Sequence, residues 1–250
     1  MKRNRIYGHI AAALFLASFL VTGCKKETLQ ENPTQPESSI TTGAQQLAPE
    51  DHTTITPERQ KIIDFFKNAE SNANSRSSEV VNRATFQGFT INYQGTVPTD
   101  IRSLVEGEIN QLLQTSTTAT TKTRMKGAPI NVYNSPGSGD LFYTGGQVYI
   151  VNFQVYRQVH SGPGNVIFHE LIHYLHDRYF SFNNSTIIGL WQGVRSRGVY
   201  PAGSYVLSNQ VEYLGVTAEA FYCNTNRPPY NRSTVQSSDP NGAAFLNANF

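Results

Sequence analysis

The chain has 250 residues, of which 11% are aromatic and only 15% are charged, and its formal net charge is +2. A chain of this length can bury a sizeable core, and these fractions exclude a wholly disordered, charge-rich protein. The charge lacks the basic excess that phosphate neutralisation requires, so we expect no nucleic acid among its partners.

The first 23 residues are typical of a bacterial lipoprotein signal peptide. Three basic residues precede an apolar stretch over 10–21, which is too short to cross a hydrocarbon core of ~30 Å. The stretch leads into Val21-Thr22-Gly23-Cys24, which resembles the lipobox, where a small residue precedes a lipidated cysteine. The resemblance implies a lipid on Cys24 and a membrane-attached, extracytoplasmic protein. The alternative is an ordinary cleavage site beside a buried thiol.

Composition divides the remaining chain in two. Residues 24–56 are rich in Thr, Ser, Gln, Glu and Pro, which predicts a disordered tether. Its first residues, Lys25-Lys26-Glu27, resemble surface-export signals of Bacteroidetes lipoproteins, so we expect the protein at the outer membrane or cell surface. A single domain over 57–250 follows, beginning with a helix that has Thr56 as N-cap and Pro57 as first residue.

The domain mixes helices with short strands, so we predict an α+β fold with a small sheet. Alternation over 85–93 predicts one strand, and apolar spacing over 101–113 predicts a helix capped by Asp100. Residues 115–127 are interpreted as a loop. Strands are predicted over 129–133 and 147–153, with turn residues between them. Helices are then expected from Asn165 and from near Asn209, and the last 25 residues are expected to be irregular, with at most a short helix after Asp239-Pro240.

The most specific motif is His169-Glu170-Leu171-Ile172-His173, inside the predicted helix over 165–179. Residues four apart lie one above the other on a helix, so two imidazoles can share one metal ion. Glu170 is offset by one residue, which directs its carboxylate to a metal-bound water. The alternative is a surface helix with solvated histidines, or a satisfied pair in the core. Four of the six histidines lie within 160–176, and we predict one zinc ion per chain.

A catalytic zinc needs a third protein ligand and an open position for water. The candidates are His176, Glu212 and Glu219. Three ligands in a line on one helix do not easily surround a tetrahedral ion, so His176 is interpreted as a neighbour of the site. Glu212 and Glu219 share one helix face, and periodicity does not choose between them. Gly215 after Glu212 permits close approach, whereas Tyr222 after Glu219 would hold two helices apart. This favours Glu212 as ligand and Glu219 as the partner of a zinc-binding histidine.

The segment from Ser204 to Gly215 resembles the corresponding stretch of the anthrax lethal factor catalytic domain and the related Pro-Pro endopeptidases, which are gluzincin-type zinc metalloproteases. In that family a glutamate ligand follows the His-Glu-x-x-His helix after about forty residues, and a tyrosine seven positions before it stabilises the transition state. Glu212 lies 39 residues after His173, and Tyr205 lies seven before Glu212. The resemblance covers roughly 165–222 and implies a zincin-like fold. Val216 departs from it, because many gluzincins have an acidic residue there.

These features predict a lipid-anchored zinc metallopeptidase, monomeric, acting on a peptide or protein. Glu170 is expected to be the general base, and Tyr205 to donate to the oxyanion unless it is only a packed aromatic residue. Residues 147–153 are either an edge strand that binds an extended peptide or a core strand. Two other functions stay open: a non-catalytic zinc-containing binding lipoprotein, and a zinc hydrolase of a non-peptide amide.

Overall fold

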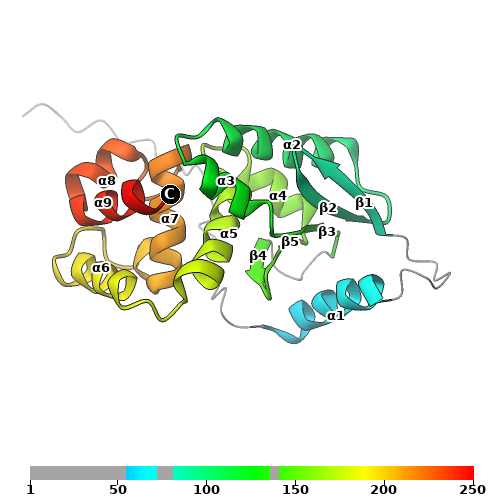
Figure 1. Ribbon diagram of the computed structural model, residues 1–250, viewed down its shortest axis with the longest axis horizontal. Helices are drawn as coiled ribbons and strands as arrows, with labels where there is room; N and C mark the ends of the chain where they lie inside the picture. The colour runs from blue at the N-terminus through cyan, green and yellow to red at the C-terminus, as the bar shows by residue number, and fades with distance from the viewer. Residues whose placement is uncertain (1–54, 72–80, 136–140) are drawn as a thin grey trace, which may run out of the picture. The chain divides into compact units, whose positions relative to one another are not determined.

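The computed structural model describes residues 55–71, 81–135 and 141–250. These residues form an α+β fold with a five-stranded sheet and nine helices, which confirms the predicted class (Figure 1). The predicted signal peptide, Cys24 and the tether up to residue 54 lie outside them. Within the described ranges, no helix combines the length and the apolar character needed to span a membrane.

The sheet has the strand order β1-β2-β3-β5-β4. β1 and β2 are antiparallel, β3 and β5 continue the sheet parallel to β2, and β4 is antiparallel to β5. The prediction of a single strand over 85–93 is wrong, because Gln87 and Gly88 have positive φ angles of 51° and 86° and turn the chain into a hairpin. The strands are β1 Val81–Phe86, β2 Phe89–Gln94, β3 Ile130–Val132, β4 Leu141–Thr144 and β5 Gln147–Ile150.

The strand predicted over 147–153 exists as β5, but it lies inside the sheet between β3 and β4. The edge strand at this end is β4, which was not predicted and which lies between the predicted turn residues 135–140 and 145–146. Leu141 pairs with Ile150 and Thr144 with Gln147 across a tight turn, in which Gly145 and Gly146 both have positive φ. The edge-strand interpretation of 147–153 is therefore wrong, and β4 has that position.

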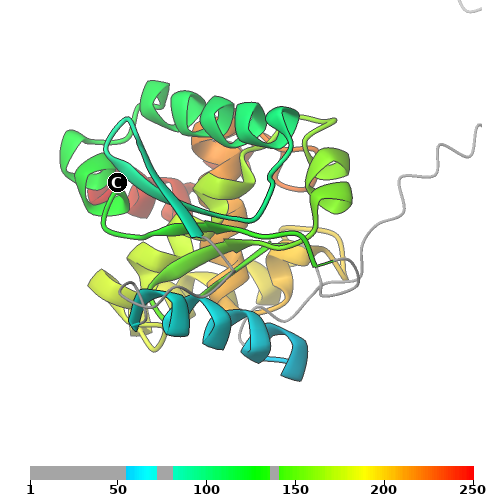
Figure 2. The same ribbon diagram turned by 90° about the vertical axis from the view of Figure 1, so that its right-hand side faces the viewer.

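Helices α1 (Pro57–Ser71) and α2 (Thr99–Gln114) lie on opposite faces of the sheet (Figure 2). The helix predicted to begin at Pro57 is thus confirmed. Its side chains Ile62, Ile63 and Phe66 pack with Phe142, Tyr149 and Val151 in a small separate core. The apolar face of α2 joins the main core. Its N-cap is Pro98 rather than the predicted Asp100, which instead accepts a hydrogen bond from Arg157 at 2.6 Å.

Helices α6, α7, α8 and α9 gather on the side of the molecule away from β1 (Figure 1). α5 packs against α7 and also against β4 and β5. The loop predicted over 115–127 contains α3, capped by the Thr118 side chain, and the expected irregular C-terminus contains α8, capped by Asn231. The predicted helix after Asp239 is confirmed as α9. These helices are α3 Ala119–Met125, α4 Phe153–Val159, α5 Val166–Leu175, α6 Ser185–Ser196, α7 Gln210–Cys223, α8 Arg232–Ser238 and α9 Pro240–Asn249.

Candidate metal centre

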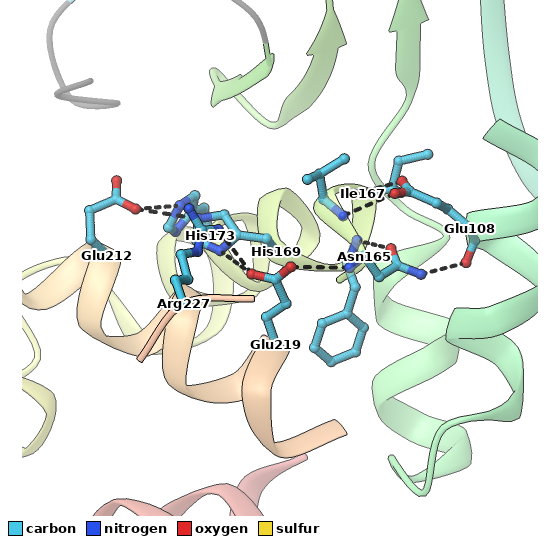
Figure 3. A network of polar contacts seen from close by, with 10 residues as sticks. Glu108, Asn165, Ile167, His169, His173, Glu212, Glu219 and Arg227 are labelled. Atoms are coloured by element: carbon cyan, nitrogen blue, oxygen red, sulfur yellow. Dashed lines mark hydrogen bonds and ion pairs between the residues drawn. The ribbon is translucent and has the colours of Figure 1, made fainter. Parts of the chain in front are cut away.

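Helix α5 carries the His-Glu-x-x-His motif, and its first turn is held by side chains. Asn165 is the N-cap, as predicted, and its Oδ1 accepts a hydrogen bond from the Phe168 amide at 2.7 Å. Glu108 of α2 accepts bonds from the Val166 and Ile167 amides at 3.1 and 3.0 Å (Figure 3). These donors have no partner inside the helix, so Glu108 and Asn165 fix where α5 begins.

Glu108 was not among the predicted site residues. It lies on the apolar face of α2, between Val105 and Leu112, and is buried. Burial raises the pKa of its carboxyl to about 8, although the two amide hydrogen bonds oppose this shift. A charged residue inside an otherwise apolar helix face was the available signal, because such a side chain needs buried partners.

His169 and His173 lie one turn apart on α5, which continues from His176 as a π-helical turn. Their ring centroids are 4.6 Å apart, and both side chains are buried. Oε2 of Glu212 on α7 lies 3.3 Å from Nε2 of His169 and 3.6 Å from Nε2 of His173. Ligand atoms of His169, Glu170 and His173 lie within 4.8 Å of one another, and this buried group can hold a metal ion.

Glu219, the other candidate carboxylate, meets His169 on the opposite side of its ring. Its Oε2 lies 3.5 Å from Nδ1 of His169 and accepts a bond from Nη2 of Arg227 at 3.0 Å. Its Oε1 accepts a bond from the Asn165 amide at 3.0 Å. Figure 3 shows Glu212 and Glu219 approaching the histidines from different positions along α7. The distances favour Glu212 as the ligand and Glu219 as the residue that orients His169.

The donor atoms around His169 and His173, which include three nearby carboxylates, fit a divalent cation. Glu170, Glu212 and Glu219 are all buried. Burial lowers the pKa of His173. It acts in the same direction on His169, but the carboxylates of Glu212 and Glu219 outweigh it and raise the pKa of His169 to about 9. Buried carboxylates that favour a proton on an imidazole also favour a cation there. Imidazole and carboxylate ligands together suit zinc.

Tyr205 lies beside the same histidines, in a short 3-10 turn before α7. Its ring stacks on His169 with centroids 6.3 Å apart. Partial burial and the Glu212 carboxylate raise its pKa far above the usual value, so the hydroxyl stays protonated and can donate. His176 packs against Phe182 with centroids 5.1 Å apart, and burial lowers its pKa to about 3. The group of His169, Glu170 and His173 does not include His176, and it does not include Glu212 or Glu219 either. Glu212 is favoured over His176 because its Oε2 lies within 3.6 Å of Nε2 of both histidines.

A cavity of about 290 Å³ lies next to His173. Its walls come from the end of edge strand β4, from α5 with its π-helical turn, and from α7. The hydroxyl of Tyr143 donates to Oδ2 of Asp177 at 2.5 Å, which connects β4 to the π-helical turn after α5. The lining residues are Tyr143, Thr144, Gly145, His173, Asp177, Phe182 and Val211.

Comparisons of this chain with models of protein families, with curated proteins and with solved structures found no match.

Gly215 lets α7 approach the two histidines. A Cβ atom at this position would lie 2.7 Å from Cε1 of His173 and 2.8 Å from Cε1 of His169. Gly215→Ala should therefore displace the imidazoles and weaken zinc binding by roughly 10- to 100-fold, as other disturbances of ligand orientation do. Zinc titration against a chromogenic chelator measures this. Gly189→Ala is the control, because its Cβ would meet no atom within 4 Å. An unchanged zinc affinity in Gly215→Ala would contradict the expectation.

Proposed function

We propose that this chain is a zinc metallopeptidase with a zincin-like active-site arrangement. The observation that carries the proposal is the position of Glu212, whose Oε2 lies within 3.6 Å of Nε2 of both His169 and His173. Two imidazoles and one carboxylate are a typical ligand set of catalytic zinc in peptidases. Glu170 lies on the same helix as the two histidines, with a carboxylate oxygen within 4.8 Å of their ligand atoms. We assign it the role of base, which such a reaction needs, rather than that of a ligand.

When bound, zinc would activate a water molecule and polarise the carbonyl of the scissile peptide bond. His169, His173 and Glu212 would hold the ion. Glu170 accepts a proton from the attacking water and passes it to the leaving amine. Tyr205 donates its hydroxyl hydrogen to the oxygen that becomes negative, and Glu219 keeps the ring of His169 in its orientation.

Edge strand β4 and the adjacent cavity support a peptide as substrate. Among the described residues, β4 pairs only with β5, so its other side can offer backbone groups to an extended chain. The cavity beside His173 would accept a substrate side chain. Phe182 and Val211 contribute apolar wall, and Asp177 contributes a carboxylate.

The proposal is tested by measuring bound zinc and by incubating the protein with an unbiased peptide library, followed by mass spectrometry. We expect about one zinc per chain and cleavage that a chelator abolishes and added zinc restores. Zinc binding without cleavage of any peptide would overturn the peptidase and favour a binding lipoprotein. If no peptide is cleaved but a non-peptide amide is hydrolysed in a parallel assay, the zinc hydrolase of non-peptide amides would be favoured.

The location of the protein is proposed to depend on a lipid on Cys24. We expect Cys24→Ala to move the protein from the membrane fraction to a soluble or retained precursor pool, because the lipid supplies the hydrophobic anchor. Fractionation followed by immunoblotting measures this, with Cys223→Ala as the control, since Cys223 is buried inside the domain. A Cys24→Ala protein that stays in the membrane pellet after a salt wash would contradict lipid anchoring.

A further inference from the structure

Arg227 lies against two residues of the proposed catalytic machinery at once. Its Nη2 donates to Oε2 of Glu219 at 3.0 Å. Its Cζ atom lies 4.8 Å from the centroid of the Tyr205 ring, close enough for a cation–π contact. Glu219 in turn faces Nδ1 of His169. One guanidinium therefore contacts both the carboxylate that orients a proposed zinc ligand and the ring of the proposed oxyanion donor.

The loop that carries Arg227 is closed by its own backbone hydrogen bonds. It joins α7 to α8 and begins at Asn224, whose φ of 62° turns the chain away from the helix. The Thr225 amide donates to the carbonyl of Tyr230 at 2.7 Å, and the Tyr230 amide donates to the carbonyl of Arg227 at 2.8 Å. These hydrogen bonds fix the conformation of the loop, so that the Arg227 side chain points back toward α7 and reaches Glu219.

The charge of the buried carboxylates explains why a positively charged side chain is needed at position 227. The carboxylates of Glu170, Glu212 and Glu219 are buried around the histidines, and a single divalent ion would leave one negative charge uncompensated. Arg227 supplies the missing positive charge. Arginine suits the position better than lysine, since a planar guanidinium can bind a carboxylate and lie on an aromatic ring at the same time.

We propose that Arg227 is a positioning residue of the metal centre, which orients His169 through Glu219 and holds the Tyr205 ring in place. This inference rests on the proposed function for the part that concerns Tyr205. The part that concerns His169 requires only that the site binds zinc.

The first experiment measures zinc affinity in the full chain, without substrate. Arg227→Gln should lower affinity by roughly 10- to 100-fold, the usual effect of losing a partner behind a metal ligand. In a Glu219→Gln background the same change should have little further effect, because the two residues act along one path. Arg227→Lys should lose less, since it keeps the charge. The control is Arg232→Lys, whose arginine also lies on a ring, Phe221, but donates to Ser116 and Asn247 instead.

The second experiment measures kcat and KM for a cleaved peptide. Arg227→Lys should lower kcat by about tenfold and leave KM within about threefold, and in a Tyr205→Phe background it should change kcat by less than about threefold. Equal effects in both backgrounds, or full zinc affinity in Arg227→Gln, would overturn the proposal. If wild-type protein binds zinc but cleaves no peptide, the proposed function and the role toward Tyr205 both fail, while the zinc titrations still decide the role toward His169.

Discussion

Glu170→Gln is expected to keep about one zinc per chain and the folded state, and to lower kcat by roughly 10²- to 10⁴-fold, the range that a positioned general base contributes. Glutamine has nearly the shape of glutamate, so the packing around this buried side chain is preserved. It cannot accept the proton of the attacking water. Zinc content by elemental analysis and peptide turnover measure the two effects separately.

This experiment also decides between two roles for Glu170. Its carboxylate lies close enough to the imidazoles to belong to the group of possible ligands. If Glu170→Gln loses its zinc stoichiometrically, then Glu170 is a ligand and the assignment as base is wrong. Glu58→Gln is the control, because Glu58 is exposed on α1, and it should change neither zinc content nor turnover.

Glu212→Ala is expected to weaken zinc binding far more than Glu219→Ala does. Removing Glu212 removes the carboxylate oxygen that faces Nε2 of both histidines. Removing Glu219 leaves all three proposed ligands in place and should cost roughly 10- to 100-fold in zinc affinity, through a less well oriented His169. Glu212→Ala should lose at least about a further tenfold, because a zinc site with two protein ligands is incomplete.

Zinc titration of both variants, with thermal unfolding of the metal-free proteins as a check on folding, measures this difference. The check matters for Glu219, whose Oε1 also accepts the Asn165 amide at the start of α5. The reverse order of zinc affinities would make Glu219 the ligand. The close approach of α7 at Gly215 would then no longer favour Glu212. Equal losses of zinc affinity would also contradict the prediction, because they would show no difference between the proposed ligand and the residue behind His169.

Local sequence patterns were sufficient to predict the two helices of the centre. Asn165 and Asn209 cap α5 and α7 with their side chains, and a cap is recognised from the residues that follow it directly. The spacing of His169 and His173 places both rings on one face for the same local reason. Gly215 was predicted to permit close contact between helices. The structure confirms this, because a Cβ atom at this position would overlap the rings of His169 and His173.

Short segments with few apolar residues were predicted less well. The threonine-rich segment that forms α3 and the polar segment that forms α8 have few apolar residues, and each helix is stabilised by its cap and by its neighbours. β4 was missed because its four residues stand between turn-forming segments. Such a strand depends on contacts with distant segments, here its pairing with β5 and the burial of Leu141, Phe142 and Tyr143.

The sequence by itself determined the α+β class, the helix with its pair of histidines, and two carboxylates on one face of a second helix. Each of these depends on residues within a few turns of one another. The tertiary structure decided that β4 rather than β5 is the edge strand, that Glu108 supports the start of α5, and that Arg227 reaches Glu219 and Tyr205. These relations join segments distant in the chain, and they arise from how the helices and the sheet pack, which local spacing does not specify.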